Sequence, residues 1–476
     1  MVSINILNQT STILLTFVLS IIFLVSGIYY SRKYKGLNNY LIANRDIGIF
    51  SLTASFVSSA LGAWILFGPA SAATWGGIGA VIGYALGTAF PLLILIALGT
   101  KFRNSFPKAK TLIEVIRLKF GKQLFKLILF LTVFYMAIFL IAEVTAVSLL
   151  VNYISGTSLW ITALIVVTSS LVYTLYGGLR ASIFTDSIQF ILFLLLFLIA
   201  ISFLVSFNST EFSLEFVKLN KPNLLSIKYF PNFTAGLTFF IAVAATNLFH
   251  QGNWQRVYAA KNNFILKKSL LISFFLIIPI VFFMGFSGLV ATSIDSNVIP
   301  DLAFFSLLFK EQTTMLSVIV LILGISLTIS SIDTLINAIS SLIIVDGNKI
   351  IKFKGNYFKL SNYLIILLSI IVFVVASKGL SILYLFLLAD LFCCSAVLTI
   401  FYSFFTKSIS EKNAYISIII GIAAGLLLFP SPDFSKSILV GILFPINFFP
   451  SFVSQSLLFL SFLIATFVPI FTWKIK

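Results

Sequence analysis

Residues 51–77 read SLTASFVSSALGAWILFGPASAATWGG, an apolar stretch long enough to cross a bilayer but interrupted at its centre. Small residues fill its first half, and Gly62 and Pro69 then disfavour a continuous helix. A second stretch, FFIAVAATNLFHQGNWQRV at 239–257, places polar side chains where lipid-facing residues are expected. Backbone groups freed at such breaks are tolerated at membrane depth only where they line a cavity or are buried in protein.

The surrounding sequence predicts a helical protein that crosses a membrane many times. The chain has 476 residues, of which 60% are hydrophobic and 9% are charged, whereas soluble domains average about 25% charged residues. Apolar runs of roughly 20 residues recur, and each is long enough to cross ~30 Å of hydrocarbon. We expect an all-α polytopic membrane protein with about 13 transmembrane helices, at 11–30, 48–72, 77–99, 124–151, 158–177, 184–206, 233–254, 269–292, 314–345, 359–377, 380–405, 413–429 and 451–472.

The positive charge of the chain is distributed as a topology signal. The formal net charge is +17, and most of the 31 lysine and arginine residues fall in alternate loops, with dense groups at 32–45, 101–126, 256–268 and 349–359. Such an excess marks the cytoplasmic side of a membrane protein. We therefore expect the N-terminus outside and the C-terminus in the cytoplasm, and we interpret the basic charge as a sign of orientation rather than of nucleic-acid binding.

The two interrupted runs also predict an internal symmetry. Counted from the second run, they are the first and sixth of ten helices, and such pairs are typical of inverted-repeat secondary transporters. We expect one extra N-terminal transmembrane helix in residues 1–30, and a ten-helix transport core at 48–405 with repeats at about 48–206 and 233–405. Two further helices and a short cytoplasmic tail are expected at 406–476.

The eighth helix of that core carries a polar stripe. In ISSIDTLINAISS, residues 329–341, one helical face holds Ser330, Asp333, Thr334, Asn337 and Ser341. An aspartate at the centre of a membrane helix costs about 2.5–3.5 kcal/mol, so it is expected to face protein, water or a cation. Hydroxyl and carboxylate oxygens suit a small hard cation, but a hydrogen-bonded seam between helices would have the same composition.

Other ionisable residues interrupt apolar runs elsewhere. Glu143 and Asp390 lie within expected helices, Asp186 opens the run at 184–206, and His250, the only histidine, lies at the second break. Asp186 suits the cap of a helix start as well as a cation site. Glu143 and Asp390 are consistent with functional acids or with protonated structural groups, and His250 with a proton relay or a structural histidine.

Three segments carry a resemblance to a known family. They are YKGLNNYLIANRDIGIFSLTAS at 34–55, TLYGGLRASIFTDSIQ at 174–189 and SSIDTLINAISSLIIVDGNK at 330–349. With these motifs the chain resembles the sodium:solute symporter family, which includes bacterial proline symporters and, more distantly, urea and polyamine permeases. The resemblance runs from about residue 36 to 405 and implies a LeuT-like fold of five plus five helices in inverted repeats.

The resemblance also implies a sodium site between the first and eighth core helices. Carried over residue by residue, three backbone carbonyls and two hydroxyls would hold Na⁺, those of Ser58, Leu61, Leu327, Ser330 and Ser331. Sodium bound at this site would stabilise one conformation of the transport gate, because that conformation would bind the ion more tightly than the other. Some relatives bind a second cation, and its counterparts here are Asp186, Asp333 and Thr334, with Ser330 shared. Asp333 replaces a serine of that pattern, so the site is consistent with a second Na⁺ or with a proton carried by one of the two carboxylates.

Departures from the relatives bear on the transported solute. The segment matching a helix that carries an arginine in carboxylate-binding members has Glu143 instead, so an anionic substrate lacks an evident partner. The string HQGNWQR at 250–256 is similar to one in urea and polyamine permeases. We expect a nitrogen-containing solute, such as urea, a polyamine, proline or another amino acid, in a pocket lined by Trp64, Glu143, Asn247, His250, Gln251, Trp254 and Asp390. Trp254 would serve equally as an interfacial anchor.

The resemblance thus implies a sodium-coupled symporter that imports the solute by alternating access across the inner or plasma membrane, with Na⁺ as coupling ion and no organic cofactor. A proton-coupled symporter and a non-transporting sensor are the alternatives, although sensors of the family carry a kinase that this sequence does not show. The sequence offers no nucleophile–base pair or metal-ligand cluster that indicates an enzyme. We expect the solute, Na⁺ and lipid as partners, and neither nucleic acid nor an obligate protein partner.

Overall fold

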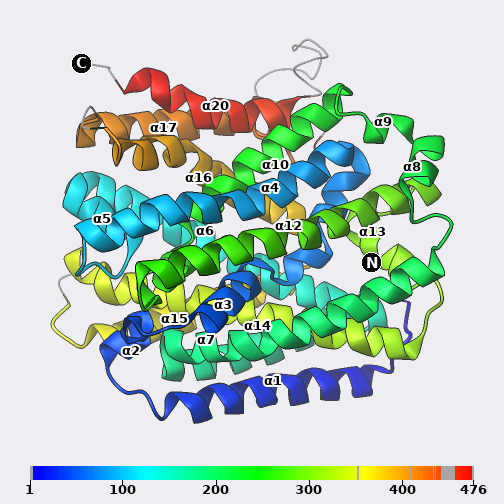
Figure 1. Cartoon of the computed structure of the whole chain (residues 1–476), viewed down its shortest axis with the longest axis horizontal. Coiled ribbons are helices and arrows are strands. Elements are labelled where there is room, and N and C mark those ends of the chain that lie inside the picture. The colour runs from blue at the N-terminus through cyan, green and yellow to red at the C-terminus, as the bar shows by residue number, and fades with distance from the viewer. Residues whose placement is uncertain are drawn as a thin grey trace.

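The computed structural model describes residues 4–350, 353–406, 409–432, 434, 436–440 and 456–473. Within these ranges the chain forms helices and no β-strand. Most helices run side by side in layers, with α1 at one edge of the bundle and α17 and α20 at the opposite edge (Figure 1). The short helices α2 and α5 lie toward one end of the bundle, and α8, α9 and α13 toward the other.

The helices follow the chain in a fixed order, with short 3-10 segments (η) between some of them. Their bounds are α1 (Gln9–Ser31), α2 (Leu37–Ile42), η1 (Ala43–Arg45), α3 (Ile49–Ala60), η2 (Ala63–Leu66), α4 (Gly68–Ser105), α5 (Leu112–Lys119), α6 (Lys122–Ser155), α7 (Leu159–Phe207), α8 (Leu214–Asn220), α9 (Pro222–Leu225), α10 (Phe230–Phe249), α11 (Gln251–Ala259), α12 (Asn263–Ile294), η3 (Pro300–Leu302), α13 (Ala303–Leu308), α14 (Thr314–Val345), η4 (Gly347–Lys349), α15 (Tyr357–Ala376), α16 (Ile382–Ser403), α17 (Glu411–Leu428) and α20 (Leu457–Thr472).

The predicted polytopic, all-helical fold class is confirmed. In the described part of the chain, 10 helical segments are long and apolar enough to cross a membrane, among them Thr174–Phe207 of α7. Three apolar helical segments are shorter: Ile49–Ala60, Leu159–Val172 of α7, and Leu457–Thr472. The number of thirteen spans, the bounds of the repeats and the orientation of the termini stay predictions. Of the last expected run and tail, residues 451–455 and 474–476 lie outside the described residues.

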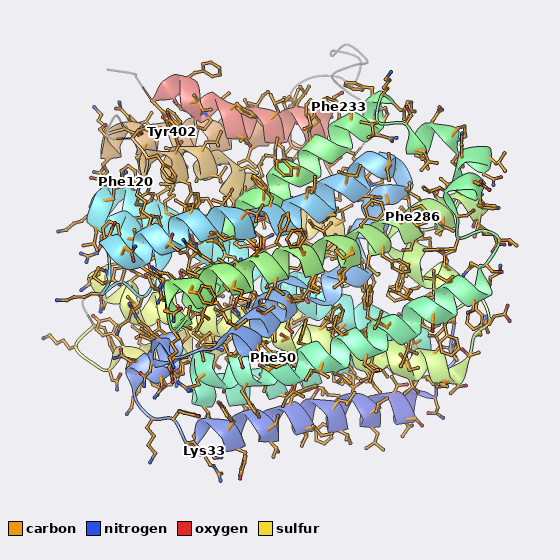
Figure 2. All side chains as sticks on the ribbon, in the orientation of Figure 1. Lys33, Phe50, Phe120, Phe233, Phe286 and Tyr402 are labelled. Carbon is orange, nitrogen blue, oxygen red and sulfur yellow. The ribbon has the colours of Figure 1, made fainter. Side chains whose placement is uncertain are left out.

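Large apolar side chains project from the outer faces of the bundle (Figure 2). Phe50 is 57% exposed and Phe233 is 49% exposed. Several apolar residues of α1, among them Leu14 and Ile22, are exposed as well. Extended apolar surfaces of this kind are rare on soluble monomers and mark contact with another apolar phase. The outer surface therefore fits the hydrocarbon of a bilayer.

Both interruptions predicted from the sequence are present. Helix α3 ends at Ala60, the chain passes through Leu61 and Gly62 in non-helical conformations, and α4 begins at Gly68 with Pro69 in its first turn. Helix α10 ends at Phe249, and His250 (φ −64°, ψ 105°) separates it from α11. Each break leaves helix-terminal N–H and C=O groups without intrahelical partners.

Two long helices change direction at a glycine. Gly77 in α4 has φ +55° and Gly178 in α7 has φ +59°, values that residues with a side chain rarely adopt. A Cβ at Gly178 would also overlap the ring of Tyr40. The 38 residues of α4 and the 49 residues of α7 are longer than one straight crossing of ~30 Å requires, and the kinks divide each into two arms.

Small residues bring the second arm of α4 against α10. A Cβ on Gly79 would overlap the backbone of Asn232, and one on Gly83 would overlap the backbone of Gly236. Small residues four apart allow such close crossings in membrane helices, where van der Waals packing drives association. This contact holds the segment after the first break beside the helix that leads into the second.

Candidate functional site

A buried carboxylate of α6 holds the first break. Glu143 is fully buried, and its Oε2 accepts a hydrogen bond of 2.8 Å from the backbone N–H of Ala63. Gly62 stands directly beside it, since a Cβ there would overlap both Glu143 Oε1 and Ser331 Oγ. Helix α6, the break and α14 therefore meet at Gly62.

The residues predicted to bind sodium lie around this meeting point. Ser330 and Ser331 of α14 are each 1% exposed; Ser330 Oγ donates to Asp186 Oδ1 at 2.6 Å, and Ser331 Oγ has no hydrogen-bond partner. Ser58 lies in the last turn of α3, where backbone carbonyls have no intrahelical donor. The Ser331 hydroxyl, which lies beside a helix break and has no hydrogen-bond partner, is suited to bind a cation that takes oxygen ligands.

The two leucines of that predicted set are also buried. Leu61 lies in the break and is 0% exposed, and Leu327 lies on α14 and is 2% exposed. Helix α14 packs against both α3 and η2, which brings the two elements of the predicted site together. The sodium ligands themselves stay a prediction.

An arginine stands among the residues predicted to hold a second cation. Arg256 of α11 is fully buried, and its Nη2 donates to Asp186 Oδ2 and to Thr334 Oγ1, both at 2.8 Å. Its Nε donates to Ser55 Oγ at 2.6 Å and its Nη1 to the carbonyl of Gly252 at 3.1 Å. The guanidinium therefore balances the charge of Asp186 and fills the space between these oxygens.

Asp333 lies next to this ion pair. Its Oδ1 accepts hydrogen bonds from Ser182 Oγ at 2.8 Å and from Thr334 Oγ1 at 3.4 Å, and its Oδ2 accepts one from Thr185 Oγ1 at 3.3 Å. The structure thus brings Asp186, Asp333 and Thr334 into one cluster, as the sequence predicts. The sequence interpretation missed Arg256, which was counted with the basic loop that follows α11.

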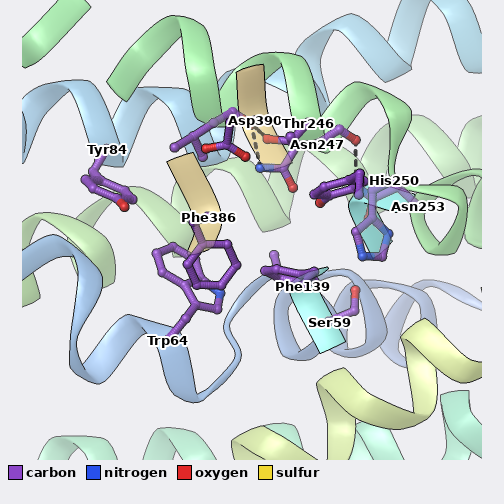
Figure 3. Close-up of a pocket in the computed structure, with 13 residues that line it drawn as sticks. Ser59, Trp64, Tyr84, Phe139, Thr246, Asn247, His250, Asn253, Phe386 and Asp390 are labelled. Carbon is purple, nitrogen blue, oxygen red and sulfur yellow. Dashed lines mark hydrogen bonds between the residues drawn. The ribbon is translucent and has the colours of Figure 1, made fainter. Parts of the chain in front are cut away.

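A cavity of about 40 Å³ lies between the two breaks (Figure 3). Four of the predicted pocket residues line it, namely Trp64, Asn247, His250 and Asp390. The other lining residues are Ser59, Ala60, Tyr84, Tyr135, Phe139, Val243, Thr246, Asn253 and Phe386. In Figure 3, Asp390 lies beside Thr246 and Asn247, Trp64 lies against Phe386, and His250 lies toward the opposite end near Asn253.

Three residues predicted for the pocket lie outside this lining. Glu143 is bound to the break as described above. Gln251 Oε1 accepts from the backbone N–H of Leu112 at 3.1 Å, and Trp254 is fully buried, where its Nε1 donates to the carbonyl of Leu248 at 2.7 Å. Gln251 and Trp254 therefore fix the segment after the second break, and Trp254 does not lie at a membrane interface as an exposed anchor would.

Asp390 is the acidic residue of the cavity. It is 5% exposed, lies beside Thr246 (Figure 3), and forms no ion pair among the described residues. At the other end, neither ring nitrogen of His250 has a hydrogen-bond partner, and the rings of Tyr135 and Phe139 meet it edge-on. The cavity therefore combines one unpaired carboxylate with several aromatic rings.

Apart from Trp64, the sequence interpretation missed the aromatic residues of the cavity. Trp64 stacks on Tyr84 with ring centroids 5.9 Å apart, and Phe386 meets both Trp64 (5.9 Å) and Phe139 (4.9 Å) edge-on. The chain contains 53 phenylalanines and 16 tyrosines, so an aromatic residue on an apolar helix carries no signal of its own. Their place in the cavity follows from the packing of the helices and not from the sequence around them.

Comparisons with known proteins agree with this architecture. The sequence model of the sodium:solute symporter family matches residues 40–421. A protein of Candida albicans named spermidine transporter DUR31 is 25% identical over 382 residues, which are 79% of this chain and 72% of the relative. Sodium/glucose cotransporter 4 of Danio rerio is 29% identical over 174 residues, 35% of this chain and 26% of the relative.

Two solved structures show the same arrangement of helices. A Na⁺-coupled sialic acid symporter in a substrate-bound, outward-open state superposes with a TM-score of 0.74 at 17% identity, covering 97% of this chain and 96% of that one. A nucleobase-cation-symport-1 family transporter in a closed conformation gives a TM-score of 0.54 at 12% identity, covering 91% and 93%. At these identities the likeness is one of fold.

Proposed function

Because the chain belongs to the sodium:solute symporter family, we propose that it imports a small solute bearing a positively charged amine together with sodium. Family membership makes it a multi-pass membrane protein and a sodium-coupled transporter, and its relatives are transporters rather than enzymes. The class of solute, the ion ligands and the inner or plasma membrane as its location are parts of the proposal.

The observation that carries the amine assignment is Asp390 in the aromatic cavity. A buried carboxylate without a counter-ion is costly, and an ammonium group would neutralise it. Aromatic faces attract cations within about 6 Å of the ring centroid, most strongly those of tryptophan. Trp64, Tyr84 and Phe386 line the same cavity, so a solute held by Asp390 would have such faces beside it.

Other nitrogenous solutes are supported less well. The carboxylate of an amino acid would find no lysine or arginine among the residues that line the cavity. Urea is neutral and would leave the charge of Asp390 unbalanced. The relative from Candida albicans, which is named a spermidine transporter and spans most of this chain, supports an amine as well.

The proposed sodium site and the solute cavity share one segment. Ser59 and Ala60 line the cavity, and they lie between Ser58 and Leu61, whose carbonyls are proposed to hold Na⁺ with Leu327, Ser330 and Ser331. A bound cation would fix the break against α14, and this would order one wall of the solute cavity. Sodium would then raise the affinity for solute, and solute the affinity for sodium, as thermodynamic linkage requires.

The test is uptake into proteoliposomes under an inward sodium gradient, with potassium as the replacement ion. We expect sodium-dependent uptake of labelled spermidine or a shorter amine. At low solute concentration this uptake should fall strongly in Asp390→Asn but not in Asp301→Asn, a matched change outside the cavity. Sodium-driven uptake of urea or proline alone would contradict the amine assignment. Uptake that ignores sodium and follows a pH gradient would favour the proton-coupled alternative.

A further inference from the structure

Two buried oxygen atoms beside Gly62 have no hydrogen-bond partner. One is Oε1 of Glu143, whose other oxygen binds the N–H of Ala63, and the second is the hydroxyl of Ser331. Both side chains are at most 1% exposed. A Cβ on Gly62 would overlap both atoms, so they converge on the same side of the break from two different helices.

Backbone N–H groups at the break, those of Ala63 and Trp64, bind the Glu143 carboxyl, but no cationic side chain of the described residues pairs with it. The ion pairs of the described chain are those of Arg256, Lys261 and Lys310, and none of them includes Glu143. Arg256 is committed to Asp186, Ser55 and Thr334. Burial of a carboxylate oxygen without any partner costs free energy, and a partner that is itself positive removes more of that cost than a neutral one.

The surrounding atoms are oxygens, which limits the kind of partner. A hydroxyl, a carboxylate oxygen and the carbonyls freed at a helix break form a set that suits a small hard cation. Gly62 keeps the space between Glu143 and Ser331 clear of any side chain. The same space lies between the break, where Ser58 and Leu61 of the proposed sodium site precede Gly62, and α14, which carries the other proposed ligands.

We propose that Glu143 Oε1 is a direct ligand of the coupling sodium, beside Ser331, and not a contact of the transported solute. This inference rests on the proposed sodium site and adds a carboxylate to its neutral oxygens. The ion then ties α6 to the break and to α14, and its charge is balanced inside the bundle. Because a charged ligand tightens binding of a hard cation more than a neutral one does, Glu143 sets the sodium affinity.

The test measures sodium binding without solute. The purified protein is titrated with NaCl at constant ionic strength, with KCl as balance, and the thermal midpoint is followed. We expect saturable stabilisation of the wild type by Na⁺ and not by K⁺. In Glu143→Gln, which keeps an acceptor for Ala63, the half-saturating sodium concentration should rise at least about ten-fold. Asp301→Asn, a matched carboxyl-to-amide change in η3, should titrate like the wild type.

Two further variants test whether Glu143 and Ser331 bind the ion between them. Gly62→Ala places a methyl group between the two oxygens and should abolish the sodium effect. If Glu143→Gln does not fold, Glu143→Asp decides, because its shortened carboxylate should bind sodium more weakly while still preferring Na⁺ to K⁺. A glutamine or aspartate variant that titrates within about two-fold of the wild type overturns the role of Glu143 and leaves the sodium-coupled function standing. A wild type indifferent to sodium overturns both.

Discussion

Replacing Arg256 with glutamine removes the positive charge that the fold places between four elements of the core. Arg256 joins α11 to Ser55 of α3, Asp186 of α7 and Thr334 of α14, and it is 0% exposed. Because the change leaves Asp186 buried without its counter-ion, the expected loss is about 3–5 kcal/mol, the usual cost of breaking a buried pair from one side. The double variant Arg256→Gln with Asp186→Asn should recover part of that loss, since no uncompensated charge remains.

The assay is thermal unfolding of the purified single and double variants, with and without sodium. The same change clears the space among Asp186, Asp333 and Thr334, so we expect sodium to stabilise Arg256→Gln more steeply with concentration than it stabilises the wild type. Such an effect would indicate a second cation site at the position that the Arg256 guanidinium occupies in the wild type. The reasoning is refuted if the single variant is as stable as the wild type, or if the double variant is less stable than the single one.

Three further predictions concern separate parts of the molecule. Asp390→Asn should raise the half-saturating concentration of an amine substrate about ten- to hundred-fold, as expected for a lost charge-assisted hydrogen bond of ~1.5–3 kcal/mol, and concentration-dependent uptake measures it. Ser331→Ala should raise the half-saturating sodium concentration about five-fold, which corresponds to ~1 kcal/mol for one neutral oxygen ligand; an unchanged value in the sodium titration would exclude its hydroxyl as a ligand. Burial raises the pKa of Asp301, whose Oδ1 accepts from Ser71 Oγ at 2.9 Å. The folded state therefore binds more protons there than the unfolded state, and the stability contributed by this group falls as pH rises from its ordinary range to its raised pKa. The thermal midpoint of Asp301→Asn should lose this part of its pH dependence, and an unaltered pH profile would contradict the assignment.

Periodicity and composition determined most of the secondary structure. The apolar runs predict long helices such as 314–345, which is α14, because a membrane helix must satisfy its backbone internally and so needs an unbroken apolar length. The breaks at Gly62 and His250 were also predicted from the local sequence, since glycine with a nearby proline, or a polar cluster, disfavours a continuous apolar helix. Such residues do not always end a helix, because Pro91 and Pro279 lie inside α4 and α12. The sequence also predicted a change near each kink, since one expected helix begins at residue 77 and another ends at residue 177. It predicted separate helices there, whereas α4 and α7 continue through Gly77 and Gly178 with a kink.

The partners of the polar residues were decided by the tertiary structure. Asp186 and Arg256 are separated by 70 positions and meet only because α7 and α11 both pack against α14. Glu143 was expected to face the solute, yet its carboxylate reaches the backbone of Ala63, 80 positions away. The aromatic side chains around Asp390 are also placed by helix packing, since phenylalanines of the cavity and phenylalanines facing lipid both lie in apolar stretches of the sequence. The sequence determined which residues are polar within the membrane, because their cost there is a local property. Which charge each one meets depends on contacts between distant helices, and only packing in three dimensions selects them.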